Sequence, residues 1–221
     1  MGQARTLRKK AAAPPARRPQ QRSADTRERL VEAGLALFAA RGFEGATTRA
    51  IAERAGVALA ALPYHFETKD ALWRAAADRL FGRLRQSFQD WSRTLGPIDR
   101  RDRFRRLFAE LVRFAARHPE LHRFMLQEGT GPSPRLAWLV ETHVRPLFDG
   151  MRGQIVEAQR ERLLPPGRPE HLFYAMIGAA SMPYAVAPEY KLLTRDDPSR
   201  PARIEEHVET LLGLFLPVLP V

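Results

Sequence analysis

Hydroxyl and cationic side chains stand at the starts of two segments near the amino end of the chain. Thr47 and Arg49 open the first segment, and Lys69 opens the second. The first N–H groups of a helix have no internal partner, so a helix start attracts anions. Hydroxyl, guanidinium and ammonium groups add phosphate ligands there. This combination predicts contact with a nucleic acid backbone.

The elements that must position these groups have the spacing of a helix-turn-helix over residues 47–66. Gly56 permits a tight turn, because glycine adopts left-handed backbone angles freely. Ala52 lies four residues earlier and is small enough for two helices to approach. Leu62 lies six residues later and would bury the second helix against the first. Such a unit places its second helix in the major groove of DNA.

A denser set of residues surrounds this unit at fixed offsets. It comprises the run Leu35–Phe43, then Ala55-Gly56-Val57, Tyr64-His65-Phe66, Lys69 and Leu72. Over about residues 25–75 this set resembles the N-terminal domain of the TetR family of bacterial transcriptional regulators. The resemblance implies an all-α fold of about nine helices. A three-helix DNA-binding head would be followed by a helical body that binds a ligand and dimerises.

The same resemblance implies a function. The chain is expected to be a homodimeric regulator and a repressor, released from a palindromic operator in double-stranded DNA by a small-molecule effector. Tyr64 and His65 would touch phosphates at the end of the recognition helix, although Tyr64 could instead pack against the first helix. Phe66 is expected in the core. The expected DNA-binding residues are Thr47, Thr48, Arg49, Ala58, Leu59, Ala60, Ala61, Tyr64, His65 and Lys69.

The recognition segment departs from the usual pattern, because residues 58–63 are apolar. Ala58 is a poor N-cap. Leu59 and its alanine neighbours cannot hydrogen-bond to base edges, though they could touch thymine methyl groups. Pro63 removes a backbone donor and would distort the helix, or tighten it to 3₁₀ geometry, near its end. Sequence preference would then depend on Arg49, a few apolar contacts and DNA shape.

Charge is concentrated at the amino end. The 221-residue chain carries a net charge of +11, and residues 1–22 hold seven Arg or Lys and no acid. We expect residues 1–22 to be a disordered basic arm that gathers phosphates, with a solubilising leader as the alternative. Residues 23–70 would form the DNA-binding domain and residues 71–221 the ligand-binding and dimerisation domain.

The chain has no cysteine, which excludes disulfides and suits a reducing cytoplasm. No secretory leader is expected, since the start lacks an apolar run. The apolar stretch 172–187 is too short to span a bilayer. A cytoplasmic protein without a membrane partner is therefore expected.

Periodicity predicts helices throughout and no strand. The first helix is expected to start at Asp25 as N-cap and to end at Gly42. Thr47 would cap the second helix, and the third would cover residues 59–65. The remaining expected helices are Thr68 to about Leu95, Asp99–Arg117, a short one from Pro119, Arg135–Leu163 with a kink at Pro146, Glu170–Ala187, and Ala202–Leu216 after a long loop.

Bulky apolar residues in the C-terminal two thirds predict a cavity for an apolar or aromatic effector, with a few polar groups for orientation. The alternative for each residue is an ordinary place in the core. The expected ligand-binding residues are Phe108, Met125, Glu128, Trp138, His143, Phe173, Tyr174, Ile177 and Tyr184.

Two late helices offer an apolar stripe and small residues, which predicts a symmetric four-helix interface between two copies. The alternative is that the stripe packs only within its own chain. The expected interface residues are Gly178, Ser181, Ile204, Val208, Leu211, Leu212 and Phe215.

An enzyme is not expected. His118 and His122 have the spacing of a zinc pair, but Pro119 separates them at a helix start, and the His-Glu-x-x-His order is absent. Neither a Gly-x-Ser-x-Gly elbow nor a phosphate-binding loop occurs. No metal or cofactor is expected. The alternatives to a regulator are a hydrophobic-ligand carrier without a specific operator and a nonspecific nucleic-acid binder.

Overall fold

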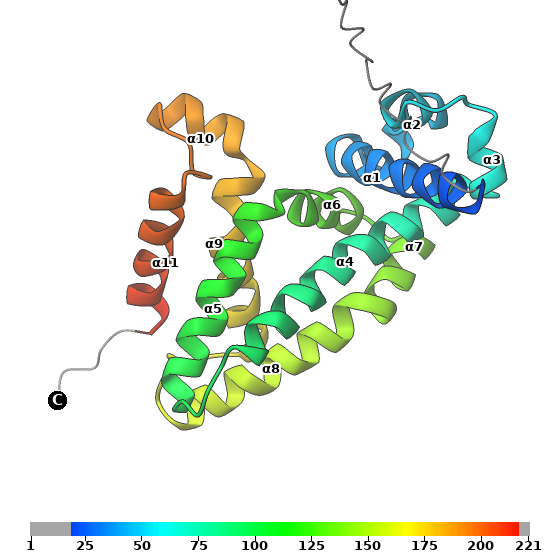
Figure 1. Cartoon of the computed structure of the whole chain (residues 1–221). Helices are drawn as coiled ribbons and strands as arrows, with labels where there is room; N and C mark the ends of the chain where they lie inside the picture. Colours follow the sequence, from blue (N-terminus) through cyan, green and yellow to red (C-terminus); the bar gives the residue numbers. More distant parts are fainter. Residues whose placement is uncertain (1–18, 217–221) are drawn as a thin grey trace, which may run out of the picture.

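The computed structural model describes residues 19–216, and within that range it is helical with no strand (Figure 1). The elements are α1 (Pro19–Gly45), α2 (Thr48–Ala55), α3 (Ala61–His65), α4 (Lys69–Arg93), α5 (Arg100–Arg117), α6 (Pro119–Gly129), α7 (Pro134–Leu139), the π-helical segment η1 (Val140–Val144), α8 (Arg145–Arg160), α9 (Pro169–Ala185), α10 (Ala187–Thr194) and α11 (Pro201–Phe215). The all-α prediction is confirmed. The expected arm lies outside the described residues except for its last four, which already belong to α1.

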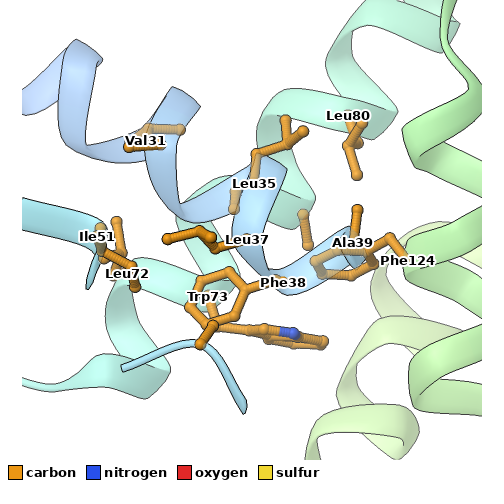
Figure 2. Packing of buried hydrophobic residues seen from close by; sticks show 14 of the residues in the cluster. Val31, Leu35, Leu37, Phe38, Ala39, Ile51, Leu72, Trp73, Leu80 and Phe124 are labelled. Atoms are coloured by element: carbon orange, nitrogen blue, oxygen red, sulfur yellow. The ribbon is translucent and has the colours of Figure 1, made fainter. Parts of the chain in front are cut away.

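Helices α1 to α3 form a head at one end of the molecule, and the long α4 leads from it into the body (Figure 1). The head folds around a stripe of α1 that meets Ile51 of α2 and Leu72 of α4 in one core. Phe38 and Trp73 are almost fully buried there, and Figure 2 shows both rings between these helices. Helix α6 of the body closes this core, because Phe124 stacks on Trp73 with ring centroids 5.2 Å apart.

The expected N-caps at Thr47 and Thr68 are confirmed, because their hydroxyls accept from the backbone N–H three residues later, at 3.2 and 3.0 Å. The Asp99 carboxylate caps α5 in the same way, accepting from the Asp102 N–H at 2.9 Å. The expected cap at Asp25 is wrong, because α1 already begins at Pro19. Proline is a favoured first helical residue, since its missing N–H would have no partner there. Regular helical backbone ends at Gly42 (φ 69°, ψ 178°), as expected, and a short turn continues to Gly45.

A second core fills the body between α5, α8, α9 and α11. Phe108 of α5, Ile155 of α8 and Met176 of α9 are buried in it. Helix α11 packs against α5 and α9, on the side of the molecule away from the head (Figure 1). The body thus has its own core, separate from that of the head.

Two parts of the body differ from expectation. The expected single helix 135–163 is α7, η1 and α8 in succession, and Arg145 N–H bonds to the Val140 carbonyl five residues back. Pro146 cannot donate to the carbonyl four residues earlier, so the hydrogen-bond register widens just before it instead of breaking into a kink. The expected long loop after residue 187 contains α10. Over residues 19–216 no helix combines the length and apolar character that crossing a membrane requires.

Candidate nucleic-acid interface

The turn between α2 and α3 has the geometry that the sequence predicts. Gly56 adopts a left-handed conformation (φ 64°, ψ 40°), and its N–H bonds to the Glu53 carbonyl at 3.0 Å. The next N–H, of Val57, returns to the Ala52 carbonyl at 3.0 Å. These bonds satisfy carbonyls that the helix end would otherwise leave free. Gly56 therefore ends α2 and directs the chain into α3.

A side chain that the sequence analysis missed secures this turn. Arg29 of α1 donates from Nε to the Ala55 carbonyl at 2.9 Å and from a terminal nitrogen to the Gly56 carbonyl at 2.6 Å. A guanidinium binds helix C-terminal carbonyls well, because they carry the negative end of the helix dipole. No local pattern marks Arg29, since its partners lie 26 and 27 residues away.

The recognition helix α3 is shorter than expected and begins at Ala61. The hydrogen bonds of 3₁₀ type lie at the start of α3 and not at its end. They run from Ala61 N–H to the Ala58 carbonyl and from Leu62 N–H to the Leu59 carbonyl. Pro63 falls in the first turn, where a missing N–H is tolerated. The expected distortion at the end of the helix is therefore wrong. Leu62 is buried and anchors α3 to the head.

The face of the head opposite this anchor is accessible. Tyr64 is 80% exposed, so the alternative that it packs against α1 is wrong, while Phe66 is in the core as expected. Leu59 is 45% exposed. All ten expected DNA-binding residues are exposed or half-buried: Thr47, Thr48, Arg49, Ala58, Leu59, Ala60, Ala61, Tyr64, His65 and Lys69.

The expected ligand-binding residues do not share one site. Met125 and Trp138 pack against the head-side core, whereas Phe108, Phe173 and Tyr184 belong to the second core. Tyr174 is largely exposed, and Ile177 is half-buried on the same helix. Two surface cavities, of about 500 and 580 Å³, are lined mainly by polar residues of α4 and α1 and by none of the nine. The expected residues thus lie in two different cores, and a pocket that they share stays a prediction.

The three polar residues expected in that pocket bind protein groups instead. Glu128 accepts from Ser133 Oγ at 2.6 Å, and the Tyr184 hydroxyl lies 3.0 Å from His207 Nδ1. His143 is buried in η1, with Nε2 2.9 Å from Asp78 and Nδ1 3.3 Å from Arg85. These contacts arise from tertiary packing, which the sequence pattern does not reveal.

Burial shifts the pKa values of two of these residues, His143 and Tyr184. Burial lowers the pKa of His143; Asp78 opposes this shift and Arg85 reinforces it. Burial raises the pKa of Tyr184 to about 12. The imidazole is therefore neutral and the phenol protonated at neutral pH, so both serve as uncharged packing groups.

Much of the expected dimer stripe is internal. Val208, Leu211 and Leu212 are buried in the second core, Ser181 is buried on α9, and Phe215 meets Phe108 edge-to-face at 5.4 Å. The intramolecular alternative describes the buried members of the stripe, whereas Phe215 is half-buried, and the interface itself stays a prediction. Gly178 and Ile204 are half-buried. The large apolar side chains that α9 to α11 do expose are Tyr174, Met182, Leu192, Leu193 and Leu214.

The geometry defines a class of protein, namely a helix-turn-helix head with an accessible recognition helix on a separate helical body. The sequence profile of bacterial regulatory proteins of the tetR family matches residues 30–82. The chain is 27% identical to the HTH-type transcriptional regulator RutR of Escherichia coli (strain K12) over 166 residues, which are 75% of this chain and 76% of RutR. It belongs to the TetR family of DNA-binding transcriptional regulators, a family of regulators rather than enzymes.

Solved structures share the fold over most of their length. The transcriptional regulator SCO4942 from Streptomyces coelicolor is 26% identical, with a TM-score of 0.62, and the match covers 86% of this chain and 98% of that one. AibR, in complex with isovaleryl coenzyme A and operator DNA, is 17% identical, with a TM-score of 0.66 and coverage of 88% and 100%. At this identity the AibR match supports the fold alone.

Proposed function

We propose that this regulator is a repressor that binds a palindromic operator as a homodimer and leaves it when a small, largely apolar or aromatic molecule binds the body. The DNA-binding part of this proposal is supported by the accessible face of the head. Leu62 anchors α3 from within, while Leu59 and Tyr64 stand exposed beside it. Thr47 caps α2 and leaves the start of that helix open to a phosphate.

The DNA contacts follow from these positions. Thr47, Tyr64, His65 and Lys69 would hold phosphates, which fixes the orientation of the head without choosing a sequence. Arg49 would reach a base edge, and Leu59 a thymine methyl group. Because α3 offers few polar groups, DNA shape would supply much of the sequence preference.

Two copies would read two half-sites about 34–36 Å apart, one turn of DNA. The exposed apolar residues of α9 to α11 supply the surface through which the copies would pair. AibR is a member of this fold that was crystallised with both an acyl coenzyme A and operator DNA. Here the effector would enter between helices of the body, α4 would swing, and the spacing of the two heads would change.

The test is selection of binding sites from a random-sequence duplex library with the full chain. We expect enrichment of a two-fold symmetric sequence. No enrichment, with affinity that falls steeply as salt rises, would indicate a nonspecific binder instead. No binding even at low salt would favour the alternative of a hydrophobic-ligand carrier.

The effector is tested separately by native mass spectrometry of the purified protein and by release of the selected duplex. Apolar or aromatic compounds should weaken DNA binding, whereas recovery of polar metabolites alone would contradict the proposed effector class.

A further inference from the structure

A phenylalanine at the edge of the head lies against two cations that come from different parts of the fold. Phe43 follows the break in α1 at Gly42, and its ring stacks on Phe38 at 5.9 Å. The Lys69 ammonium, at the start of α4, lies 4.3 Å from the Phe43 ring centroid. The Arg135 guanidinium, from α7 of the body, lies 3.7 Å from the same centroid. Cations are attracted to aromatic faces at these distances.

The two cations differ in what neutralises them. Arg135 pairs with the buried Glu128 of α6, at 3.3 Å, and this pair is mostly shielded from solvent. Glu128 also accepts from Ser133 Oγ, and that hydroxyl in turn caps α7 by accepting from Leu136 N–H at 2.9 Å. Arg135 is thus held by a network that joins α6 to α7. Lys69 has no carboxylate within ion-pair distance among residues 19–216.

The surroundings leave Phe43 little freedom. A Cβ added at Gly42 would lie 3.0 Å from the Gln127 amide oxygen, so α6 already approaches the backbone just before the ring. Helix α6 also packs along α1. The Phe43 ring therefore contacts both the α6–α7 corner of the body, through Arg135, and the ammonium of Lys69.

We propose that Arg135 is a positioning residue for DNA binding, because it fixes the Phe43 ring that orients the Lys69 ammonium towards a DNA phosphate. This inference rests on the proposed contact of Lys69 with DNA. It gives the body a route to the head through the α6–α7 corner, in addition to the swing of α4. Displacement of that corner would withdraw Arg135 from the ring and loosen Lys69.

The test measures equilibrium binding to a fluorescein-labelled duplex of about 30 base pairs, long enough for two half-sites and taken from the library selection. We expect Arg135→Gln to weaken binding about two- to fivefold, the range for loss of a half-exposed cation–π contact. Arg135→Lys should restore most of the affinity. Lys69→Ala should weaken binding and reduce the salt slope by about one unit. The double variant should be no weaker than Lys69→Ala alone, because Arg135 acts through Lys69.

The matched control is Arg74→Gln. Arg74 also makes a cation–π contact between α4 and α7, 4.9 Å from the Trp138 ring centroid, but it does not touch Phe43. The affinity of the Arg74→Gln variant for the duplex should stay unchanged. Phe43→Leu keeps an apolar group against Phe38 and should reproduce Arg135→Gln, so it replaces that variant if thermal melts show that Arg135→Gln does not fold.

The outcomes separate the inference from the proposed function. If the effects of Arg135→Gln and Lys69→Ala multiply, or if Arg74→Gln weakens binding equally, the positioning role is wrong. It is also wrong if only Lys69→Ala weakens binding, although the phosphate contact then stands. If Lys69→Ala leaves affinity and salt slope unchanged, the proposed contact itself is wrong.

Discussion

Gly56 shows how one residue fixes the angle between the helices of the head. Its left-handed backbone lets Gly56 and Val57 N–H groups return to the end of α2, and Arg29 binds the carbonyls on the other side. An added Cβ would meet only the Arg29 side chain, at 3.6 Å. The restriction at this position is therefore one of backbone angle and not of space.

We expect Gly56→Ala to lower the free energy of unfolding by roughly 1–2 kcal/mol, the strain of a non-glycine residue in the left-handed region. Urea unfolding followed by circular dichroism measures it. The control is Gly153→Ala in the exposed interior of α8, where an added Cβ meets nothing within 4 Å. That change should stabilise the chain by up to about 1 kcal/mol. Equal effects of the two changes would contradict this account of Gly56.

At the scale of elements, α3 is the weakest helix of the head. It has five residues, and no side chain caps its start. The Ala58 carbonyl accepts the first tight bond, from Ala61 N–H at 2.9 Å, so Ala58 begins the turn that leads into α3 and has no side-chain oxygen to cap that turn. The recognition helix therefore depends on the burial of Leu62 and on the turn at Gly56.

Ala58→Ser should supply the missing cap and stabilise the head by about 1 kcal/mol. The variant should also bind the selected duplex more tightly, because less of the recognition helix has to become ordered when the head binds DNA. Ala60→Ser is the matched control, since Ala60 has helical angles (φ −61°, ψ −19°) that do not suit a cap. Thermal melts and DNA titrations of both variants test this. A gain with Ala60→Ser as large as with Ala58→Ser would show that the added hydroxyl does not act as a cap.

Helix α9 exposes Tyr174 and Met182, which are 71% and 46% accessible, on the side away from its own core. Gly178 lies between them, and an added Cβ there meets nothing within 4 Å, so a partner helix could approach closely. We expect Tyr174→Glu with Met182→Glu to convert a dimer to a monomer at micromolar concentration, measured by light scattering. The helical content of the chain should change little if these residues serve only the interface, whereas the thermal midpoint should fall with the loss of the dimer, because association stabilises the folded state.

Leu126→Glu is the control, because Leu126 on α6 is exposed to a similar degree, 45%, but lies outside α9 to α11. It should leave the molar mass unchanged. A monomeric parent protein, or dimers that survive the double change, would contradict the proposed interface.

At the scale of the whole molecule, buried imidazoles link stability to pH. Burial lowers the pKa of His122, His143 and His207 below the usual 6.5. Between the lowered values and 6.5 the unfolded chain binds more protons than the folded one, so stability rises with pH there. The contribution of these imidazoles to stability is fully present above pH 6.5, and it is lost as the pH falls below that value.

Urea titrations between about pH 5 and 7.5 measure this dependence. His143→Asn should flatten the slope, since it removes one buried imidazole, even though it also removes the contacts to Asp78 and Arg85. A stability that stays constant or increases on acidification would contradict the prediction.

The sequence predicted what local chemistry determines. The caps at Thr47 and Thr68 and the turn at Gly56 depend on residues within a few positions of each other. The place of Arg29 could not be predicted, because its partners are distant in the chain. Burial of much of the expected dimer stripe within one chain could not be predicted for a similar reason, since a periodic apolar face indicates burial but not whether the same chain or a second copy covers it.

The arrangement of the body was harder to predict from the sequence than that of the head. The apolar residues expected around one ligand divide between two cores, because composition does not distinguish a cavity from packing. Apolar periodicity also did not predict the π-helical register before Pro146 or the helix α10, since each alters only a few residues of an otherwise helical pattern.

The π-helical segment η1 constrains how this chain tolerates insertions and deletions. Each residue of an α-helix advances the side-chain direction by about 100°. Loss of one residue between Val140 and Val144 would remove the widened turn and leave Pro146 inside a continuous α-helix from Pro134 to Arg160. It would also turn α8 by that angle relative to α7, so that Ile155 would leave the body core while Trp138 kept its place. The widened turn therefore sets the rotational phase between the half of this rod that packs on the head and the half that packs on the body.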